Sequence, residues 1–552
     1  SSAASDVYKR QDSIVTNRYS NAIKDLTSGN SVNKNLINLL NEPNKISLST
    51  DYFIEQTVNE KFLDSTKILV EKALSTNDLF LIQGPPGTGK TTIITEIIAQ
   101  LYLANPKMKI LFVSPSHVAV DHAINNVQKL LKKCILPEQR VEDIILRLGV
   151  EEKISYKNGE LSFENHTNRW VQSVKKYSLA YFYEHMLKDK IKSDEKRKDI
   201  YEILNDDSIT NRQFLTNLVE HENQNLEKMS YILKDWYRNL HSNNDFQSLS
   251  IDEIFLVAST CTGIASENMK EAAYDWVIID EAARATAPEL LIPLVKGKKA
   301  ILVGDHKQLP PIVSSDSDEY SLDKGKLEQS LFENLYNKMG TDVKRTLTTQ
   351  FRMHPAISNM INDLFYFEEK ITTYIDKKSY PLEKYYKPIT WVDTGVLEKS
   401  EEHKKSTSYI NYAEADMIVK QLEELDTRAK KLNKKYNVGI ISGYGAQTEL
   451  ISNNIKEFLV KFENLEIDVN NVDAFQGSEK DIIFYSVVRS NNNRNIGFLK
   501  DERRLNVALS RAKEQLFIVG NIDISKYEPI DENPFSRLLN YITGNPETCQ
   551  IL

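Results

Sequence analysis

One eight-residue stretch constrains the fold of this chain more than any other. Residues 84–91 read Gly-Pro-Pro-Gly-Thr-Gly-Lys-Thr and match the phosphate-binding pattern G-x-x-x-x-G-K-[ST] at each fixed position. An apolar run, residues 79–82, precedes the stretch, and a helix-like run, residues 92–99, follows it. Backbone N–H groups at a helix start attract phosphate oxygens, and the helix dipole adds positive potential. The stretch therefore predicts a strand, a phosphate loop and a helix in that order.

A triphosphate is the ligand that this loop predicts. Lys90 is expected to reach the outer phosphates, and the Thr91 hydroxyl is expected to hold Mg²⁺. A plain glycine-rich turn is the alternative, and the flanking strand and helix disfavour it. The residues predicted to contact the nucleotide are Gly84, Pro85, Pro86, Gly87, Thr88, Gly89, Lys90, Thr91 and Thr92.

Two later strand ends supply matching chemistry. Asp280 and Glu281 follow the apolar run 277–279; the first suits Mg²⁺ coordination and the second suits orienting and deprotonating the attacking water. Gln308 follows the run 300–303, and its neutral amide can report whether the γ-phosphate is present. Taken alone, these segments also fit an acidic helix start and a proline-stopped turn.

Composition bounds the remaining choices. A length of 552 residues fits about three to four domain-sized units, and a formal net charge of -8 indicates no global basic field, although a basic groove stays possible. The three cysteines, Cys134, Cys261 and Cys549, form no C-x-x-C pair, which disfavours a disulfide framework or a zinc ribbon. His117 and His122 lack partners at metal-ligand spacing. With no long apolar run and no signal peptide, a soluble, cytoplasmic protein is expected.

The pattern of apolar runs predicts an α/β fold with two parallel sheets flanked by helices. The first sheet is expected from runs 79–82, 110–113, 254–258, 277–279 and 300–303, and the second from runs 438–442, 482–488 and 515–519. Residues 151–250 lose this alternation and predict a helical insertion whose stripe of Trp170, Val174, Tyr177 and Tyr181 is expected to pack into a core rather than stack on bases. The expected domains are therefore 51–150 with 251–345, the insertion 151–250, and 346–552. Residues 1–50 are expected to be an N-terminal segment, a remnant of a longer upstream region.

The motifs occur in an order that resembles a known family. GPPGTGKT, VSPSHVAVDH, VIIDEAARA, GDHKQLPP, TTQFRMHPAIS, GIISGYGAQ, VDAFQGSEKD and RRLNVALSRAK follow one another as do the motifs of superfamily 1 helicases. Within that superfamily, the motifs resemble the subgroup that contains the nonsense-mediated-decay RNA helicase and its DNA-acting relatives. The resemblance covers about residues 60 to 520, apart from the insertion and the stretch 370–437. It implies two RecA-like domains, with ATP between them and single-stranded RNA or DNA across their top.

The resemblance also implies roles for residues of the second domain. Arg352 and Arg511 match the arginine fingers that stabilise charge on the transferring γ-phosphoryl group, so hydrolysis is expected to need closure of the two domains. Phe351 matches an aromatic residue that stacks on the base, and Glu479 matches a carboxylate that meets the ribose. A core phenylalanine and a surface charge are the alternatives for these two residues.

Contacts to the nucleic-acid strand are implied at the carboxyl edges of both sheets. Such contacts bind the phosphate backbone and carry no sequence information. The residues implied are Ser114, Pro115, Ser116, His117, Thr260, Thr262, Asp473 and Gln476.

Three departures from the family pattern stand out. Lys67 occupies the position of the adenine-reading glutamine, so weaker selection of ATP over GTP is expected unless a neighbour such as Gln56 reads the base. Asn471 replaces a hydroxyl residue that precedes Phe475. No small β-barrel is evident before the phosphate loop, which leaves unwinding, as distinct from translocation, open.

Three hypotheses about function follow. The first is an ATP-driven 5′→3′ helicase or translocase on single-stranded RNA or DNA, a nucleic-acid-stimulated ATPase that uses Mg²⁺. The second is an ATP-gated clamp that binds and releases a strand without unwinding. The third is the motor subunit of a nuclease or defence assembly, with a protein partner that the insertion could bind.

Overall fold

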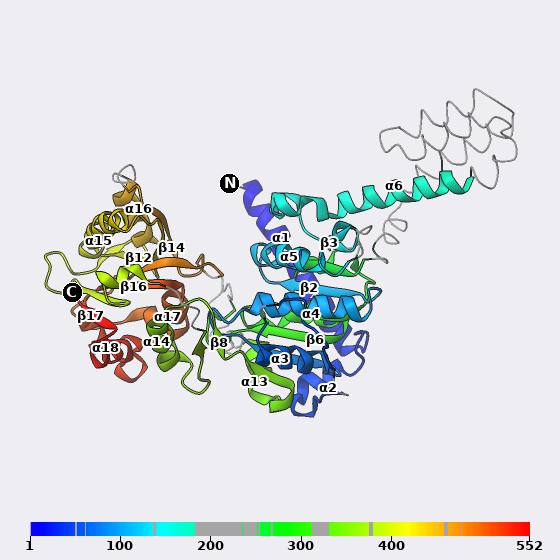
Figure 1. Cartoon of the computed structure of the whole chain (residues 1–552), viewed down its shortest axis with the longest axis horizontal. Coiled ribbons are helices and arrows are strands. Elements are labelled where there is room, and N and C mark those ends of the chain that lie inside the picture. The colour runs from blue at the N-terminus through cyan, green and yellow to red at the C-terminus, as the bar shows by residue number, and fades with distance from the viewer. Residues whose placement is uncertain are drawn as a thin grey trace, which may run out of the picture.

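The chain folds into two lobes, each built on a parallel β-sheet (Figure 1). In Figure 1 the first lobe carries β2 and α4, the second carries the C-terminus, and β8 (Thr349–Gln350) lies between them. The computed structural model describes residues 2–49, 52–60, 62–135, 140–182, 235, 251, 254–266, 269–311, 330–374, 379–456, 462–475 and 477–552.

The first lobe contains a seven-stranded sheet in which each pair of neighbours is parallel. Its central strands are fully buried because helices cover the sheet, as the uninterrupted apolar runs predict. The strands, in spatial order, are β3 (Ile145–Arg147), β4 (Leu256–Thr260), β2 (Ile110–Ser114), β5 (Tyr274–Ile279), β6 (Gly297–Gly304), β1 (Leu79–Gln83) and β7 (Lys344–Thr346).

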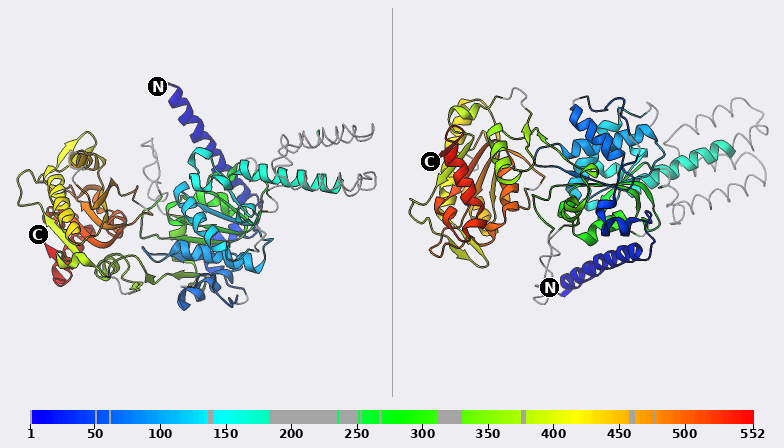
Figure 2. Two further views of the ribbon diagram at one scale, coloured as in Figure 1. Left: turned by 45° about the horizontal axis from the view of Figure 1, so that its top comes forward. Right: turned by 90° about the horizontal axis from the view of Figure 1, so that it is seen from below.

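Helices of the first lobe follow its strands or pack beside them. The main ones are α3 (Asp64–Leu74), α4 (Lys90–Ala104), α5 (His117–Leu131), α11 (Ala287–Leu294) and α13 (Leu331–Lys338). The N-terminal helix α1 (Ser2–Thr27) lies along α11 and stands out from the lobe in both views of Figure 2, and the short α2 (Leu36–Asn41) follows it. The N-terminal segment is therefore helical and attached to the first lobe.

The second lobe contains a six-stranded parallel sheet between two layers of helices. Successive residues of its central strand alternate between two cores: Ile483 packs with one and Phe484 with the other, as the two-residue period of a strand requires. The strands, in spatial order, are β14 (Leu465–Asn471), β13 (Tyr436–Ser442), β15 (Lys480–Ser486), β16 (Ala512–Gly520), β10 (Ile389–Asp393) and β17 (Cys549–Ile551). One helical layer holds α14 (Pro355–Phe365), α17 (Glu502–Leu509) and α18 (Pro534–Gly544); the other holds α15 (Tyr412–Lys431) and α16 (Gly445–Lys456).

The eight strands predicted from the sequence are confirmed, and five further strands of the two main sheets were not predicted. Four of these five lie at sheet edges, where half of the hydrogen-bonding groups face outward and long apolar runs are not needed. β7 is only partly buried and β14 alternates buried with exposed residues. The fifth, β10, has a buried Ile-Thr-Trp-Val run that its β-branched composition could have revealed.

Residues 151–182 are largely helical, but the predicted core stripe is wrong in one respect. Tyr177, on α6 (Phe163–Phe182), has an exposed fraction of 76%, whereas its helix neighbour Val171 is fully buried. The reason is visible in Figure 1, where α6 leaves the first lobe after its first turns and projects away from it. The remainder of the insertion, including the side chain of Tyr181, lies outside the described residues.

Within the described part of the chain, no helix combines the length and the apolar character needed to cross a membrane.

Candidate active site and nucleic-acid interface

The phosphate loop links β1 to α4 at the carboxyl edge of the first sheet. Gly87 and Gly89 have φ values of 73° and 81°, which non-glycine residues rarely adopt. Lys90 Nζ donates to Gly84 O at 2.7 Å, and a Cβ built on Gly84 would lie 2.3 Å from Lys90 Cγ. Glycine at position 84 therefore lets the lysine side chain fold back across the loop, where its charge faces the space that phosphates would occupy.

The two predicted carboxylates, Asp280 and Glu281, directly follow β5. They therefore lie at the same carboxyl edge of the sheet as the phosphate loop. Asp280 is buried, and burial followed by the charge of Glu281 raises its pKa to about 7 against the opposing charge of Lys90. Glu281 adopts a left-handed backbone conformation with φ 53°, and its N–H donates to Asp280 Oδ1 at 2.8 Å. Backbone strain of this kind clusters at functional sites, and here it sets the direction of the Glu281 side chain.

The residues predicted to hold Mg²⁺ fit that ion. Thr91 offers a hydroxyl oxygen at the start of α4, and Asp280 offers a buried carboxylate beside the charge of Lys90. Mg²⁺ in nucleotide sites takes one or two protein oxygens and completes its shell with phosphates and water. The described residues contain no cluster of three His, Cys, Asp or Glu side chains suited to a metal.

Gln308 belongs to a buried hydrogen-bonded group after β6. Its Nε2 donates to Asp305 Oδ2 at 2.5 Å, and Gln83 Nε2 donates to Asp305 Oδ1 at 2.6 Å. Burial raises the pKa of Asp305, and the charge of Lys90 opposes this rise. Asp305 thus fixes the amide predicted to sense the γ-phosphate.

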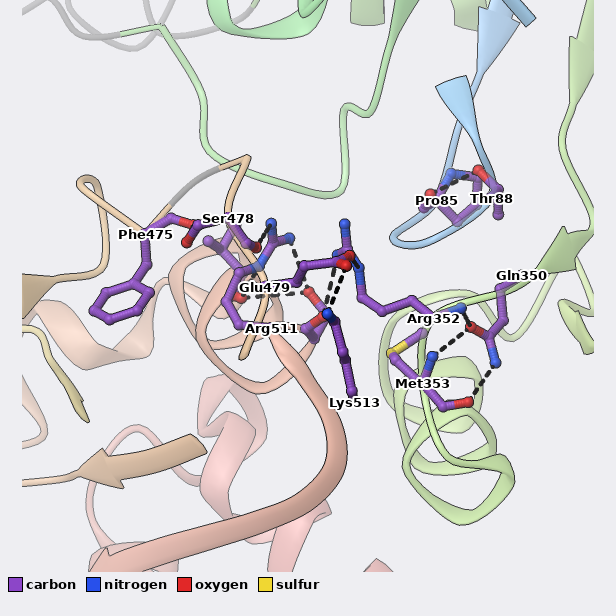
Figure 3. A network of polar contacts seen from close by, with 12 residues as sticks. Pro85, Thr88, Gln350, Arg352, Met353, Phe475, Ser478, Glu479, Arg511 and Lys513 are labelled. Atoms are coloured by element: carbon purple, nitrogen blue, oxygen red, sulfur yellow. Dashed lines mark hydrogen bonds and ion pairs between the residues drawn. The ribbon is translucent and has the colours of Figure 1, made fainter. Parts of the chain in front are cut away.

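The second lobe places Arg352 against the phosphate loop (Figure 3). A Cβ built on Gly87 would lie 2.7 Å from Arg352 Cβ, and Phe351 N donates to Gly87 O at 2.9 Å. Arg352 Nε donates to Glu479 Oε2 at 2.7 Å, while Lys513 Nζ lies 2.9 Å from Glu479 Oε1. Both oxygens of the carboxylate predicted to meet the ribose therefore contact cations of the second lobe.

Arg511, the second predicted finger, is buried at the junction of the lobes. Its Nε donates to Val507 O at 2.9 Å, and its terminal nitrogens donate to Ser478 O and to Gln308 Oε1, each at 3.3 Å. Burial, and then the charge of Arg352, lower its pKa to about 9. A second-lobe guanidinium is thus hydrogen-bonded directly to Gln308 of the first lobe.

A second bridge between the lobes was missed by sequence reasoning. Tyr366 Oη donates to Asp305 Oδ2 at 2.6 Å and accepts from Asn506 Nδ2 at 2.9 Å. Asn506 Nδ2 also donates to Lys307 O at 2.8 Å. Asn506 lies within the RRLNVALSRAK motif, which could have drawn attention to it, whereas nothing in the sequence marks Tyr366.

Phe351 lies where a base could stack. Its ring is 40% exposed and stands 5.4 Å from the ring of Tyr374, which is 48% exposed. The rings are tilted by 40° and belong to the segments around β8 and β9 (Thr372–Thr373). Tyr374 is a candidate base-contacting residue that the sequence did not single out.

The first-lobe residues predicted to contact nucleic acid lie at the ends of the neighbouring β-strands β2 and β4. These β-strands are in the half of the sheet away from β1 and the phosphate loop. Ser114 and Thr260 are register partners at the ends of β2 and β4. Ser116 Oγ accepts from Ala119 N at 3.1 Å and Thr260 Oγ1 accepts from Gly263 N at 3.1 Å, so each hydroxyl can still donate its hydrogen. Phosphate oxygens are suitable acceptors for such hydrogens.

The other residues predicted to contact nucleic acid lie in several different environments. His117 begins α5, where its Nδ1 lies 3.2 Å from Arg147, and burial followed by the charge of Arg147 lowers its pKa. Thr262 O accepts from Arg18 of α1 at 2.9 Å, and Pro115 is partly buried beside Ser116. Asp473 follows β14 and pairs with Arg504 at 3.2 Å. Gln476 lies outside the described residues.

Lys67, the departure from the family pattern, lies on α3. Its Nζ is 4.0 Å from Glu71 Oε1 and 5.1 Å from the centre of the Phe53 ring. The backbone oxygen of Gln56 accepts from Gln100 of α4 at 3.0 Å, which holds residue 56 against the helix that starts at the phosphate loop.

Comparisons with known proteins agree with this arrangement. Two family models, both described as AAA domain, match residues 61–316 and 327–523. An uncharacterised ATP-dependent helicase of Methanocaldococcus jannaschii is 30% identical over 516 residues, covering 87% of this chain and 70% of the relative. The regulator of nonsense transcripts 1 homolog of Neurospora crassa is 31% identical over 83% of this chain, which spans only 37% of that protein. The DNA polymerase alpha-associated DNA helicase A of Saccharomyces cerevisiae is 29% identical over 85% of this chain and 66% of its own length.

The fold and site define a P-loop ATPase with two RecA-like domains. Together with the archaeal and fungal relatives, they identify the family. The chain belongs to the superfamily 1 helicases, in the group that contains the regulator of nonsense transcripts; these proteins are ATP-dependent and act on nucleic acid.

Proposed function

We propose that this chain is a motor that hydrolyses ATP with Mg²⁺, moves 5′→3′ along single-stranded RNA or DNA, and unwinds duplexes ahead of it. One observation carries the proposal: Arg511 of the second lobe donates to Gln308 of the first at 3.3 Å. Because the hydrolytic residues come from both lobes, ATP binding and turnover are coupled to how the lobes sit against each other. Coupled lobe movement is what stepping along a strand requires.

Each group at the site has a proposed part in hydrolysis. Lys90 and the loop N–H groups bind the outer phosphates, and Glu281 orients and deprotonates the water. Thr91 and Asp280 hold Mg²⁺, which when bound neutralises phosphate charge. Arg352 and Arg511 stabilise the negative charge that develops on the γ-phosphoryl oxygens.

Base and ribose contacts are proposed at the opening of the site. Phe351 stacks on the base, with Tyr374 beside it. Glu479 contacts the ribose only if it shares or exchanges a cation, because Arg352 and Lys513 occupy its two oxygens. Ribose binding would then release Arg352 toward the phosphates.

The single strand is proposed to cross the carboxyl edges of both sheets. In the first lobe, Ser116 and Thr260 donate to phosphates, whereas the fully buried Ser114 does not reach them; in the second, Asp473 and Gln476 lie on the path. Binding through phosphates makes affinity fall steeply with salt and vary little with sequence. We further propose domains at residues 51–150 with 251–345 and at 346–552, and a helical insertion at 151–250 whose exposed Tyr177 faces a partner or the strand.

ATPase rates measured in parallel with single-stranded RNA, single-stranded DNA and duplex test the proposal. Single strands should stimulate hydrolysis, and Lys90→Ala should abolish both basal and stimulated turnover. A tailed duplex distinguishes a helicase from a clamp, since only the helicase displaces the second strand. Absence of stimulation by either kind of single strand would overturn the proposal, and stimulation without displacement would reduce it to translocation or clamping.

A further inference from the structure

A pocket of about 530 Å³ opens on the second lobe, away from the ATP site. It lies at the carboxyl ends of β13 and β15, between Gly443 and Gly445 on one side and Arg489 and Gly497 on the other. The hairpin formed by β11 (His403–Lys405) and β12 (Ser408–Ile410) provides another wall. This is the same sheet edge on which the proposed strand contact Asp473 follows β14.

Three aromatic rings form the pocket's apolar surface. Tyr409 and Tyr444 stand edge to face with ring centres 5.7 Å apart, and Tyr444 and Phe498 are 4.6 Å apart. Phe498 is 41% exposed, whereas Tyr444 is buried. An exposed ring backed by two others is a platform on which a flat ligand can stack without reorganising the protein.

The charge inside the pocket is already balanced. The Arg489 guanidinium lies 4.7 Å from the Tyr409 ring centre, its Nε is 3.1 Å from Glu402, and it donates to Asn495 O at 2.6 Å. A guanidinium held in this way stiffens the wall and leaves no unpaired charge for an anion to neutralise. The remaining lining offers neutral hydroxyl and amide groups from Thr407, Ser408 and Asn495, which suit a neutral, flat, hydrogen-bonding occupant.

Further cations belong to the segments that form the pocket. Lys404 of the hairpin and Arg494 are exposed. Arg504 reaches both the Phe498 ring, at 5.9 Å, and Asp473, at 3.2 Å, so it stands between the pocket and the proposed path of the strand. On a chain with a net charge of -8, cations near the exposed Phe498 ring favour a nucleic-acid ligand.

We propose that this pocket receives one base of the bound single strand, turned out of the stack and placed against Phe498 at the second-lobe end of the path. The inference rests on the proposed function, because it places the base of a strand whose phosphates cross the two sheets. The base is held by stacking and by neutral groups, so any of the bases fits. The pocket anchors the strand to the second lobe while the first lobe moves.

An abasic-site scan tests the pocket. A strand just long enough for full affinity is synthesised with a single abasic site at each position in turn, and binding is measured by fluorescence anisotropy. One position should weaken binding to the parent roughly 5- to 100-fold, the range expected for loss of one base–aromatic stack. Phe498→Ala should bind the intact strand more weakly by a similar factor and should no longer respond to an abasic site at that position.

Two matched variants complete the design. Phe498→Tyr keeps the ring and should behave as the parent, and Phe367→Ala removes an exposed aromatic ring elsewhere on the second lobe and should keep the position-specific loss. If Phe498→Ala does not fold, a second measurement uses the parent protein. A strand that carries the fluorescent base 2-aminopurine at the sensitive position should change its fluorescence on binding more than strands that carry it at neighbouring positions.

The outcomes separate the two proposals. A flat scan in the parent, or a position-specific loss unchanged in Phe498→Ala, overturns the base pocket while leaving the motor intact. Failure of the intact strand to bind the parent or to stimulate its ATPase overturns the proposed function itself. Binding of the aromatic pocket to a protein segment instead of a base would appear as a flat scan.

Discussion

The two lobes share a sheet architecture but use their buried carboxyl groups differently. In the first lobe, Asp280 and Asp305 are buried beside the charge of Lys90, at the edge that faces the phosphate site. In the second lobe, Glu414 of α15 is equally buried but accepts from Ser486 Oγ at 2.7 Å and from Val488 N at 2.8 Å. In the first lobe, Asp280 lies beside Lys90 and Asp305 holds the side chains of Gln83, Gln308 and Tyr366, whereas Glu414 of the second lobe holds backbone.

The backbone that Glu414 holds explains the difference. Val488 has φ 71°, a conformation that is strained for a β-branched residue, and it directly precedes Arg489 in the aromatic pocket. The acid therefore supports a binding surface and takes no part in hydrolysis. The comparison implies that substituting the first-lobe acids stops ATP hydrolysis. Substitutions in the second lobe are instead expected to alter the coupling between the lobes, the binding of the nucleic-acid strand or the stability of the lobe.

The largest effect is expected where the second lobe enters the site of the first. Arg352→Ala or Arg511→Ala should lower stimulated hydrolysis about 10³-fold, the effect typical of an arginine finger, with the nucleotide still bound. Arg428→Ala, which removes a second-lobe guanidinium that packs on Tyr386, is the matched control and should leave turnover unchanged. Steady-state ATPase assays with and without single strand provide the measurement. Normal stimulated rates in both finger variants would mean that the first lobe hydrolyses ATP alone.

The Tyr366 bridge provides a sharper test of coupling. Tyr366→Phe removes a hydroxyl that bonds both Asp305 and Asn506, at 2.6 and 2.9 Å, and should lower strand-stimulated kcat about tenfold while basal kcat changes less. Tyr527→Phe is the control, because it loses one hydroxyl hydrogen bond, from Asn491 N, within the second lobe. Equal losses of basal and stimulated kcat would show a structural role instead of a coupling role.

Glu414 predicts how the second lobe's stability depends on pH. Burial raises its pKa from 4.5 to about 8, so the folded state keeps a proton that the unfolded state releases between these values. The free energy of unfolding should therefore fall as pH rises from about 4.5 to 8, by up to about 1.4 kcal/mol per pH unit. Glu414→Gln should flatten this slope in denaturant titrations at pH 5.5 and 7.5, and the exposed Glu423→Gln should not. Identical slopes for the parent and Glu414→Gln would place the ionisation elsewhere.

The smallest effect concerns the base side of the first lobe. A lysine offers only donors to a purine edge, whereas glutamine offers a donor and an acceptor to adenine. Lys67→Gln should shift the ratio of kcat/KM for ATP and GTP toward ATP by a few-fold, with Lys72→Gln on the same helix as control. A strong preference for ATP in the parent that the substitution leaves unchanged would remove Lys67 from base recognition, in keeping with its contacts to Glu71 and Phe53.

Local sequence determined the parts whose physics is local. An α/β fold with an ATP site was predicted from the glycines of the phosphate loop, the acids after a buried strand and the order of the motifs. These features are predictable because backbone conformation and strand burial depend on residues that are neighbours in the sequence. The central strands were found for the same reason: burial on both faces requires continuous apolar runs.

The tertiary structure alone decided what depends on distant segments meeting. Edge strands carry too few apolar residues to be recognised from the sequence. Tyr177 is exposed because α6 projects away from the first lobe, although its apolar stripe predicted packing against that lobe. Tyr366 joins Asp305 to Asn506, which is 140 positions away from it along the chain. The aromatic pocket likewise gathers Tyr409, Tyr444 and Phe498 from three separate segments of the chain. No local pattern encodes such meetings, since each is fixed only when the sheets have closed and the helices have packed on them.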